Sequence, residues 1–169
     1  RVLEITHRAF TVNEAKTYMV EPFCVKLSGG RWYMLARSVE KGRLLLYSLD
    51  RLEHVRTTEQ KFELPRDFVA KDYFADFFGI VIDENVPLQR IVLRADKYHQ
   101  YYMCTLPMHH SQRELFSCDD YADFELTLRP TYDFYMRLMS WGNMIKVLEP
   151  QSLQDEQRKW LRKTMEVYR

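Results

Sequence analysis

Residues 28–37 read Ser-Gly-Gly-Arg-Trp-Tyr-Met-Leu-Ala-Arg, and this stretch decides how the first part of the chain folds. Gly29 and Gly30 are adjacent, and glycine adopts positive φ at no steric cost, so the pair favours the tight turn of a β-hairpin. Residues 17–27 and 31–39 are the two strands that this turn would join. Pro22 cannot donate to a strand ladder, so an edge or a bulge is expected near it.

The stretches on either side of this hairpin also read as short strands with short connections. The expected strands are residues 2–10, 17–27, 31–39, 43–48 and 53–57. About five such strands suit a small closed or nearly closed barrel. Beyond Pro65, apolar residues in 66–78 recur at helical spacing, which predicts a helix that ends at Gly79. Residues 83–87 are polar with a proline, and we interpret them as a linker.

The rest of the chain alternates between strand and helix patterns. The expected strands are residues 88–94, 114–118, 124–129 and 144–148, and the expected helices are residues 95–104, 131–141 and 150–168. This β-α-β-β-α-β-α order is that of a ferredoxin-like unit with one additional helix. The sequence therefore predicts an α+β protein with two domains, a barrel with its trailing helix over residues 1–82 and an α+β extension over residues 88–169.

Composition and charge narrow the classes of function. The chain has 169 residues, of which 46% are hydrophobic, and a net charge of +1. Residues 1–61 hold eleven Lys and Arg against seven Asp and Glu, whereas residues 62–85 hold two against six. The basic first third would attract an anionic ligand, although a solvated basic surface is an equally good interpretation.

Several features point away from secretion, membrane insertion, metal binding and catalysis. Three cysteines without a spacing motif indicate reduced thiols, so we expect a cytoplasmic protein. No apolar run is long enough for a membrane span. The cysteines and histidines between residues 104 and 118 lack the paired spacing of zinc sites. The sequence shows no glycine-rich phosphate loop or paired-carboxylate motif, so we expect no catalytic residue, no metal and no cofactor.

Three ordered segments carry a resemblance to a known family. Gly30-Arg31-Trp32-Tyr33-Met34-Leu35 follows Val20-Glu21-Pro22-Phe23 and precedes Tyr47-Ser48-Leu49-Asp50-Arg51-Leu52, and together they resemble the WYL domain. Further on, Ser140-Trp141-Gly142 and Ile145-Lys146-Val147-Leu148-Glu149-Pro150 resemble the extension that often follows WYL domains. The resemblance covers nearly the whole chain in the right order.

The resemblance implies a fold, a function and partners. The WYL domain is a five-stranded SH3/Sm-like barrel, found in bacterial transcriptional regulators downstream of a DNA-binding helix-turn-helix. That head is absent from this chain, which begins at Arg1, so we expect a portion of a longer protein. The implied ligand is a nucleic acid or nucleotide-like effector, and a homodimer is expected.

Strand alternation suggests which side chains would meet such an effector. Trp32, Met34 and Ala36 share one face, which we assign to the core. The opposite face carries Arg31, Tyr33 and Arg37, and we pair it with the face of Arg43 and Tyr47. Two aromatic rings among arginines could stack a base and grip a phosphate. Alternatively, Tyr33 and Tyr47 form a cross-strand pair that only stabilises the sheet.

Three further residues complete the predicted ligand site. Arg51 could contact the ligand or form an internal pair with Asp50 or another neighbour. Arg8 could join the charged site, and His7 is expected to be half-buried with its hydrogen bonds satisfied. The full predicted set is His7, Arg8, Arg31, Tyr33, Arg37, Arg43, Tyr47 and Arg51.

The preferred hypothesis is a non-enzymatic, ligand-sensing module that modulates a missing DNA-binding head. The alternative is a barrel that itself binds single-stranded nucleic acid, by analogy to Sm-like folds.

Overall fold

The glycine pair lies at the tip of the longest hairpin of the computed structural model. Strands β2 (Lys16–Ser28) and β3 (Arg31–Ser38) pair from Ser28↔Arg31 to Val20↔Ser38. Gly29 and Gly30 have φ values of +55° and +78°, the left-handed conformation in which side chains with a Cβ are strained. The register of β2 shifts just after Pro22, which confirms the predicted bulge.

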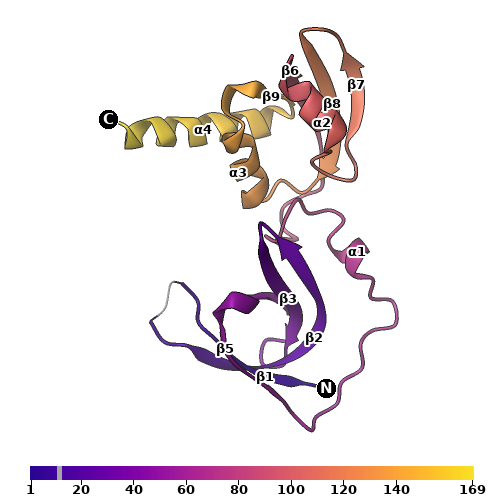
Figure 1. Cartoon of the computed structure of the whole chain (residues 1–169), viewed down its shortest axis with the longest axis vertical. Coiled ribbons are helices and arrows are strands. Elements are labelled where there is room, and N and C mark those ends of the chain that lie inside the picture. Colours follow the sequence, from indigo (N-terminus) through magenta and orange to yellow (C-terminus); the bar gives the residue numbers. More distant parts are fainter. Residues whose placement is uncertain (11–12) are drawn as a thin grey trace. The chain divides into compact units, whose positions relative to one another are not determined.

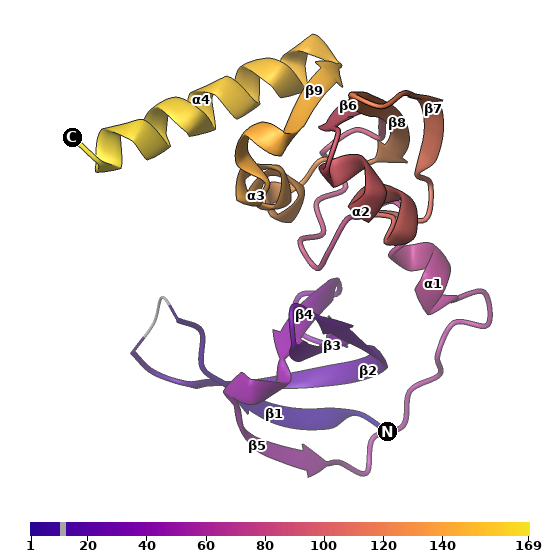
Figure 2. The same cartoon turned by 45° about the horizontal axis from the view of Figure 1, so that its top comes forward.

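The structure describes residues 1–10 and 13–169, in two compact units, residues 1–73 and 74–169 (Figures 1 and 2). The first unit also contains β1 (Leu3–His7), β4 (Leu44–Ser48) and β5 (Leu52–Thr57). A 3-10 turn, Leu49–Arg51, joins β4 to β5. The five predicted strands are therefore present, in one antiparallel sheet of order β4-β3-β2-β1-β5. No ladder links β4 to β5 in the described part of the chain, so the closed SH3/Sm-like barrel stays a prediction.

One face of this first sheet forms a small core. Its buried members are Ile5, Val20, Met34, Ala36 and Tyr47. The assignment of Trp32 to this core was wrong, because its side chain is 51% exposed. Trp32 pairs with Leu27 close to the hairpin tip, and Leu27 is also 54% exposed, so this end of the hairpin lies outside the core.

The aromatic run after Pro65 does not form the predicted helix over residues 66–78. Only α1 (Ala70–Tyr73) is helical. Phe68 packs edge-to-face on Phe23 of the first unit, with ring centroids 4.9 Å apart, whereas Phe78 packs on Phe134 of the second. The rings therefore pack against two separate units and do not share one continuous helix face.

Gly79 was expected to end that helix, and the structure gives it another role. A Cβ at this position would collide with the carboxylate of Asp133. That carboxylate accepts hydrogen bonds from the backbone N–H groups of Ile80, at 2.8 Å, and Val81, at 3.1 Å. The missing side chain thus lets the chain approach Asp133 closely.

The second unit follows the predicted order of strands and helices. Its elements are β6 (Gln89–Asp96), α2 (His99–Thr105), β7 (Arg113–Ser117), β8 (Tyr121–Leu128), α3 (Tyr132–Ser140), β9 (Ile145–Glu149) and α4 (Gln151–Val167). The sheet order is β7-β8-β6-β9, with every neighbouring pair antiparallel. The protein is therefore α+β with two antiparallel sheets, and the ferredoxin-like assignment stays a prediction.

The core of the second unit is the larger of the two. Phe124 and Phe134 are its largest fully buried side chains, and Leu153 anchors α4 to it. The predicted domain limits, 1–82 and 88–169, stay predictions. No helix within the described residues combines the length and the apolar character that crossing a bilayer requires.

Candidate functional site

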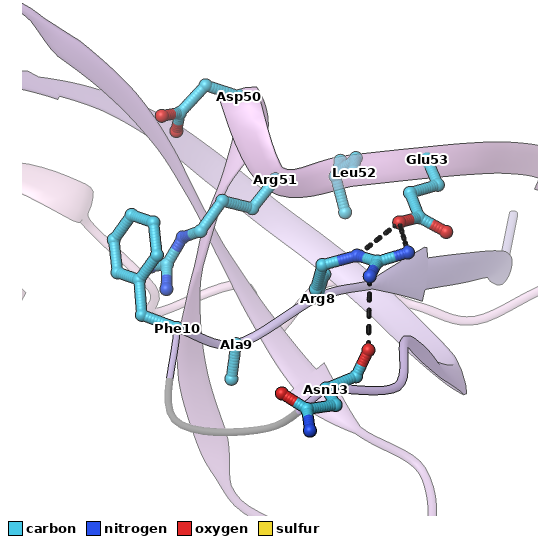
Figure 3. Close-up of a pocket in the computed structure, with 8 residues that line it drawn as sticks. All are labelled: Arg8, Ala9, Phe10, Asn13, Asp50, Arg51, Leu52 and Glu53. Atoms are coloured by element: carbon cyan, nitrogen blue, oxygen red, sulfur yellow. Dashed lines mark hydrogen bonds and ion pairs between the residues drawn. The ribbon is translucent and has the colours of Figure 1, made fainter.

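A pocket of about 380 Å³ opens in the first unit, between the segment after β1 and the start of β5 (Figure 3). Strands β1 and β5 pair with each other, and the backbone N–H of Arg8 donates to the carbonyl of Arg51 at 3.1 Å. This pairing brings together two segments that are about forty residues apart in the sequence. The lining residues are Arg8, Ala9, Phe10, Asn13, Asp50, Arg51, Leu52 and Glu53.

Arg51 is the cation that dominates the pocket. Its guanidinium lies over the ring of Phe10, 4.5 Å from the centroid, as Figure 3 shows. Its Nε is buried without a hydrogen-bond partner, and no carboxylate in the described part of the chain forms an ion pair with it. The predicted internal pair between Arg51 and Asp50 is therefore not formed. A positive charge without a carboxylate partner is suited to an anion.

The other charges of the pocket are already paired. The Arg8 guanidinium contacts Glu53 twice, at 2.6 Å and 2.5 Å, and donates to the carbonyl of Asn13 at 3.1 Å. Asp50 accepts from the hydroxyl of Ser48 and contacts Arg31 at 3.3 Å. The Ser48 hydrogen bond, followed by the charge of Arg31, holds the pKa of Asp50 below its ordinary value. Arg31 is thus tied to the pocket rim, with its guanidinium 6.0 Å from the Phe10 ring.

The remaining predicted residues do not form a single surface with this pocket. Arg37 lines another pocket and donates to Glu21 at 2.5 Å. Arg43 is exposed in the turn before β4, and Tyr33 is half-buried on β3. Arg8, Arg31 and Arg51 are therefore the predicted basic residues that the structure brings together.

The placement of Tyr47 beside Tyr33 was wrong. In the β3–β4 register Tyr33 lies opposite Ser48, whereas Met34 lies opposite Tyr47. Tyr47 consequently points into the core, where it is 5% exposed and packs on His7 and Tyr18. Burial raises the pKa of its phenol. The register also rules out the alternative of a direct cross-strand pair between the two tyrosines, and Tyr47 is not part of the pocket.

His7 is half-buried, as predicted. Its ring meets that of Tyr47 edge-on, with centroids 5.7 Å apart. Its Nε2 is buried without a hydrogen-bond partner among the described residues, so the expectation that its hydrogen bonds are satisfied was wrong. Burial lowers the pKa of His7, and the nearby charge of Arg51 lowers it further, whereas Asp50 raises it in part. Desolvation and a neighbouring cation both favour the neutral imidazole.

We expect His7 to titrate below its ordinary value of 6.5 in nuclear magnetic resonance spectra of the imidazole protons. The unfolded chain would then take up this proton first as the pH falls. The contribution of His7 to the free energy of unfolding is full above a pH of about 6.5 and declines as the pH drops toward the folded pKa. His7→Gln should remove this part of the pH dependence. A titration midpoint at or above 6.5 would contradict the assignment.

Sequence reasoning missed Phe10, Asn13 and Glu53. Phe10 is 77% exposed, and a large exposed ring directly after His7 and Arg8 was the available signal. Glu53 could have been found only from the pairing of β1 with β5, because nothing in the local sequence links it to Arg8.

Comparisons with known proteins match both units. The family model of the WYL domain matches residues 1–57, and that of the WCX domain matches residues 87–165. No curated protein matches the chain.

Two solved structures are similar to the chain. One is the crystal structure of a CRISPR Cas-related protein, with 11% identity and a TM-score of 0.56, over 99% of this chain and 47% of that one. The other is proteasome accessory factor B/C (PafBC) of Arthrobacter aurescens, with 19% identity and a TM-score of 0.41, over 92% of this chain and 23% of that one. The chain thus spans less than half the length of either protein. The two family models match its two units in the predicted order, so the chain carries a WYL domain followed by a WCX domain.

Proposed function

We propose that the chain is the ligand-sensing portion of a bacterial transcriptional regulator and that it binds an anionic, nucleic-acid or nucleotide-like effector in the pocket of Figure 3. The WYL domain suggests a regulatory, ligand-sensing role. The observation that carries the choice of ligand is Arg51, a cation without a carboxylate partner among the described residues, stacked on an exposed aromatic ring.

The pocket offers two kinds of contact to such an effector. The guanidinium of Arg51 can donate two parallel hydrogen bonds to a phosphate. The ring of Phe10 can stack a base, and stacking of this kind contributes about 1–3 kcal/mol per base. A carboxylate of the pocket holds each of the nearby cations Arg31 and Arg8, and a phosphate would compete with Asp50 or Glu53 for them.

Binding at this pocket would act on other parts of the regulator. In this proposal the effector alters the pose or the dimerisation of a DNA-binding head in the cytoplasm, without chemical conversion of the effector.

Fluorescence anisotropy with short labelled single-stranded DNA and RNA, and competition by unlabelled nucleotides, tests the proposal. Saturable binding is expected, and two or three phosphate contacts should weaken it about tenfold between roughly 50 and 200 mM salt. Absence of binding to any of these anions would contradict the proposal. Binding that does not respond to salt would exclude a phosphate-centred site and the alternative nucleic-acid-binding function as well.

A further inference from the structure

A second pocket in the first unit has a different chemical character. It has a volume of about 420 Å³ and lies between the sheet and the segment that follows β5. Phe23 and Arg37 line it from β2 and β3, and Asp67, Phe68, Asp72 and Tyr73 line it from the returning segment. A cavity of this size accommodates a small molecule.

Three aromatic rings form one wall of the second pocket. Phe68 meets Phe23 edge-on, with centroids 4.9 Å apart and an interplanar angle of 87°. The ring centroids of Phe68 and Tyr73 are 6.0 Å apart. The rings of Phe23, Phe68 and Tyr73 are each half-buried and line the pocket, and the guanidinium carbon of Arg37 lies 6.0 Å from the centroid of the Phe23 ring. The faces of such rings carry negative potential and attract cations.

The charges around these rings sum to a negative value. Arg37 is the basic residue of the lining, and Glu21 holds its guanidinium at 2.5 Å, so these two charges cancel. Asp67 and Asp72 remain, and neither forms an ion pair with any residue that the structure describes. The second pocket is therefore acidic where the pocket of Figure 3 is basic.

We propose that the second pocket binds an organic cation that carries an alkylated ammonium group. The aromatic faces would contact the alkyl groups and the positive charge together, and the two carboxylates would supply the counter-charge. This site lies apart from the anion pocket and shares none of its lining residues, so it does not rest on the proposed function. The ammonium group could belong to a free small molecule or to the lysine side chain of a partner protein.

Titration of the full chain with choline, followed in amide proton–nitrogen correlation spectra, tests this site. Saturable shifts are expected at the amides of Gly42, Val69 and Asp72 and not at Gly142 in the second unit. Dimethylbutanol, the neutral analogue with carbon in place of nitrogen, should bind about tenfold more weakly. Nα-acetyl-lysine amide forms the second arm. Tighter binding of choline indicates a free ligand, tighter binding of the lysine derivative indicates a protein side chain, and either result supports the cation site.

Matched variants decide whether the carboxylates and rings are responsible. The double variant Asp67→Asn, Asp72→Asn should weaken choline binding about tenfold. Phe68→Leu keeps an apolar side chain, removes the aromatic face and should also weaken binding several-fold. The double variant Asp119→Asn, Asp120→Asn removes two exposed carboxylates from the second unit and should leave the affinity unchanged. Equal affinity for choline and dimethylbutanol, no saturable binding, or an unchanged affinity in the Asp67, Asp72 variant would overturn the proposal.

Discussion

Replacing Arg51 with alanine is expected to weaken the binding of single-stranded nucleic acid by about 10- to 100-fold. Hydrogen bonds to a charged partner contribute about 1.5–3 kcal/mol each, and about 1.4 kcal/mol corresponds to a factor of ten in affinity. Arg51 carries a positive charge that no described carboxylate neutralises. The other basic residues at the pocket, Arg8 and Arg31, are each held in an ion pair that would have to break before they could replace it. Anisotropy titrations of the wild-type chain and the variant at one salt concentration measure the loss.

Two further variants separate the charge of Arg51 from its geometry. Arg51→Lys keeps the positive charge but loses the planar fork and the flat contact with Phe10, so we expect a loss between those of wild type and alanine. Arg162→Ala removes an exposed arginine from α4 in the second unit and should not change the affinity. If Arg51→Ala, with a wild-type circular dichroism spectrum, bound as tightly as wild type, the pocket of Figure 3 would not be the effector site.

The sequence predicted the strands well because their signals are local. Gly29 and Gly30 adopt the positive φ values that a tight turn needs. The residues from Arg31 onward are rich in β-forming side chains, so a strand is expected directly after the turn. Similar turn and helix-end residues predicted the five strands of the first unit and the three helices of the second unit, in the order observed. Such signals depend only on residues that are adjacent in the chain, so a single sequence is enough to detect them.

The face of Tyr47 could not be predicted in this way. Alternation fixes which residues of one strand share a face, but it does not fix which residues of the next strand lie opposite. In the structure, odd-numbered residues of β3 pair with even-numbered residues of β4, so Tyr33 and Tyr47 lie on opposite faces. The backbone bonds from Ser38 N–H to the Arg43 carbonyl and from Gly42 N–H to the Ser38 carbonyl set that register through the turn.

The candidate site was predicted only in part for a related reason. Arg8 and Arg51 were proposed from their charge and from the family resemblance, and the structure places both in one pocket. Phe10 and Glu53 join them through the pairing of β1 with β5, which is a contact between distant parts of the sequence. The prediction of a helix over residues 66–78 was wrong because helical spacing cannot distinguish one apolar face from rings that pack against two different units.

Replacing Phe124 with alanine is expected to lower the free energy of unfolding of the second unit by about 3–5 kcal/mol. Phe124 is 1% exposed on β8, a central strand that pairs with β6 on one side and β7 on the other. Truncation would remove a ring from the middle of the largest core cluster and leave a cavity that two flanking strands prevent from collapsing. Hydrogen exchange of the amides in β6 and β8 reports the loss within this unit, independently of the first unit.

Phe116→Ala provides the matched control for this effect. Phe116 lies on the neighbouring edge strand β7, is 49% exposed and contacts one ring, that of Tyr121. Its truncation removes the same atoms from a site where water already reaches them, so we expect a loss below about 1 kcal/mol. A much larger loss of unfolding free energy for Phe124→Ala than for Phe116→Ala would show that the core around Phe124 stabilises the second unit. Equal losses would show instead that this core does not hold the sheet together.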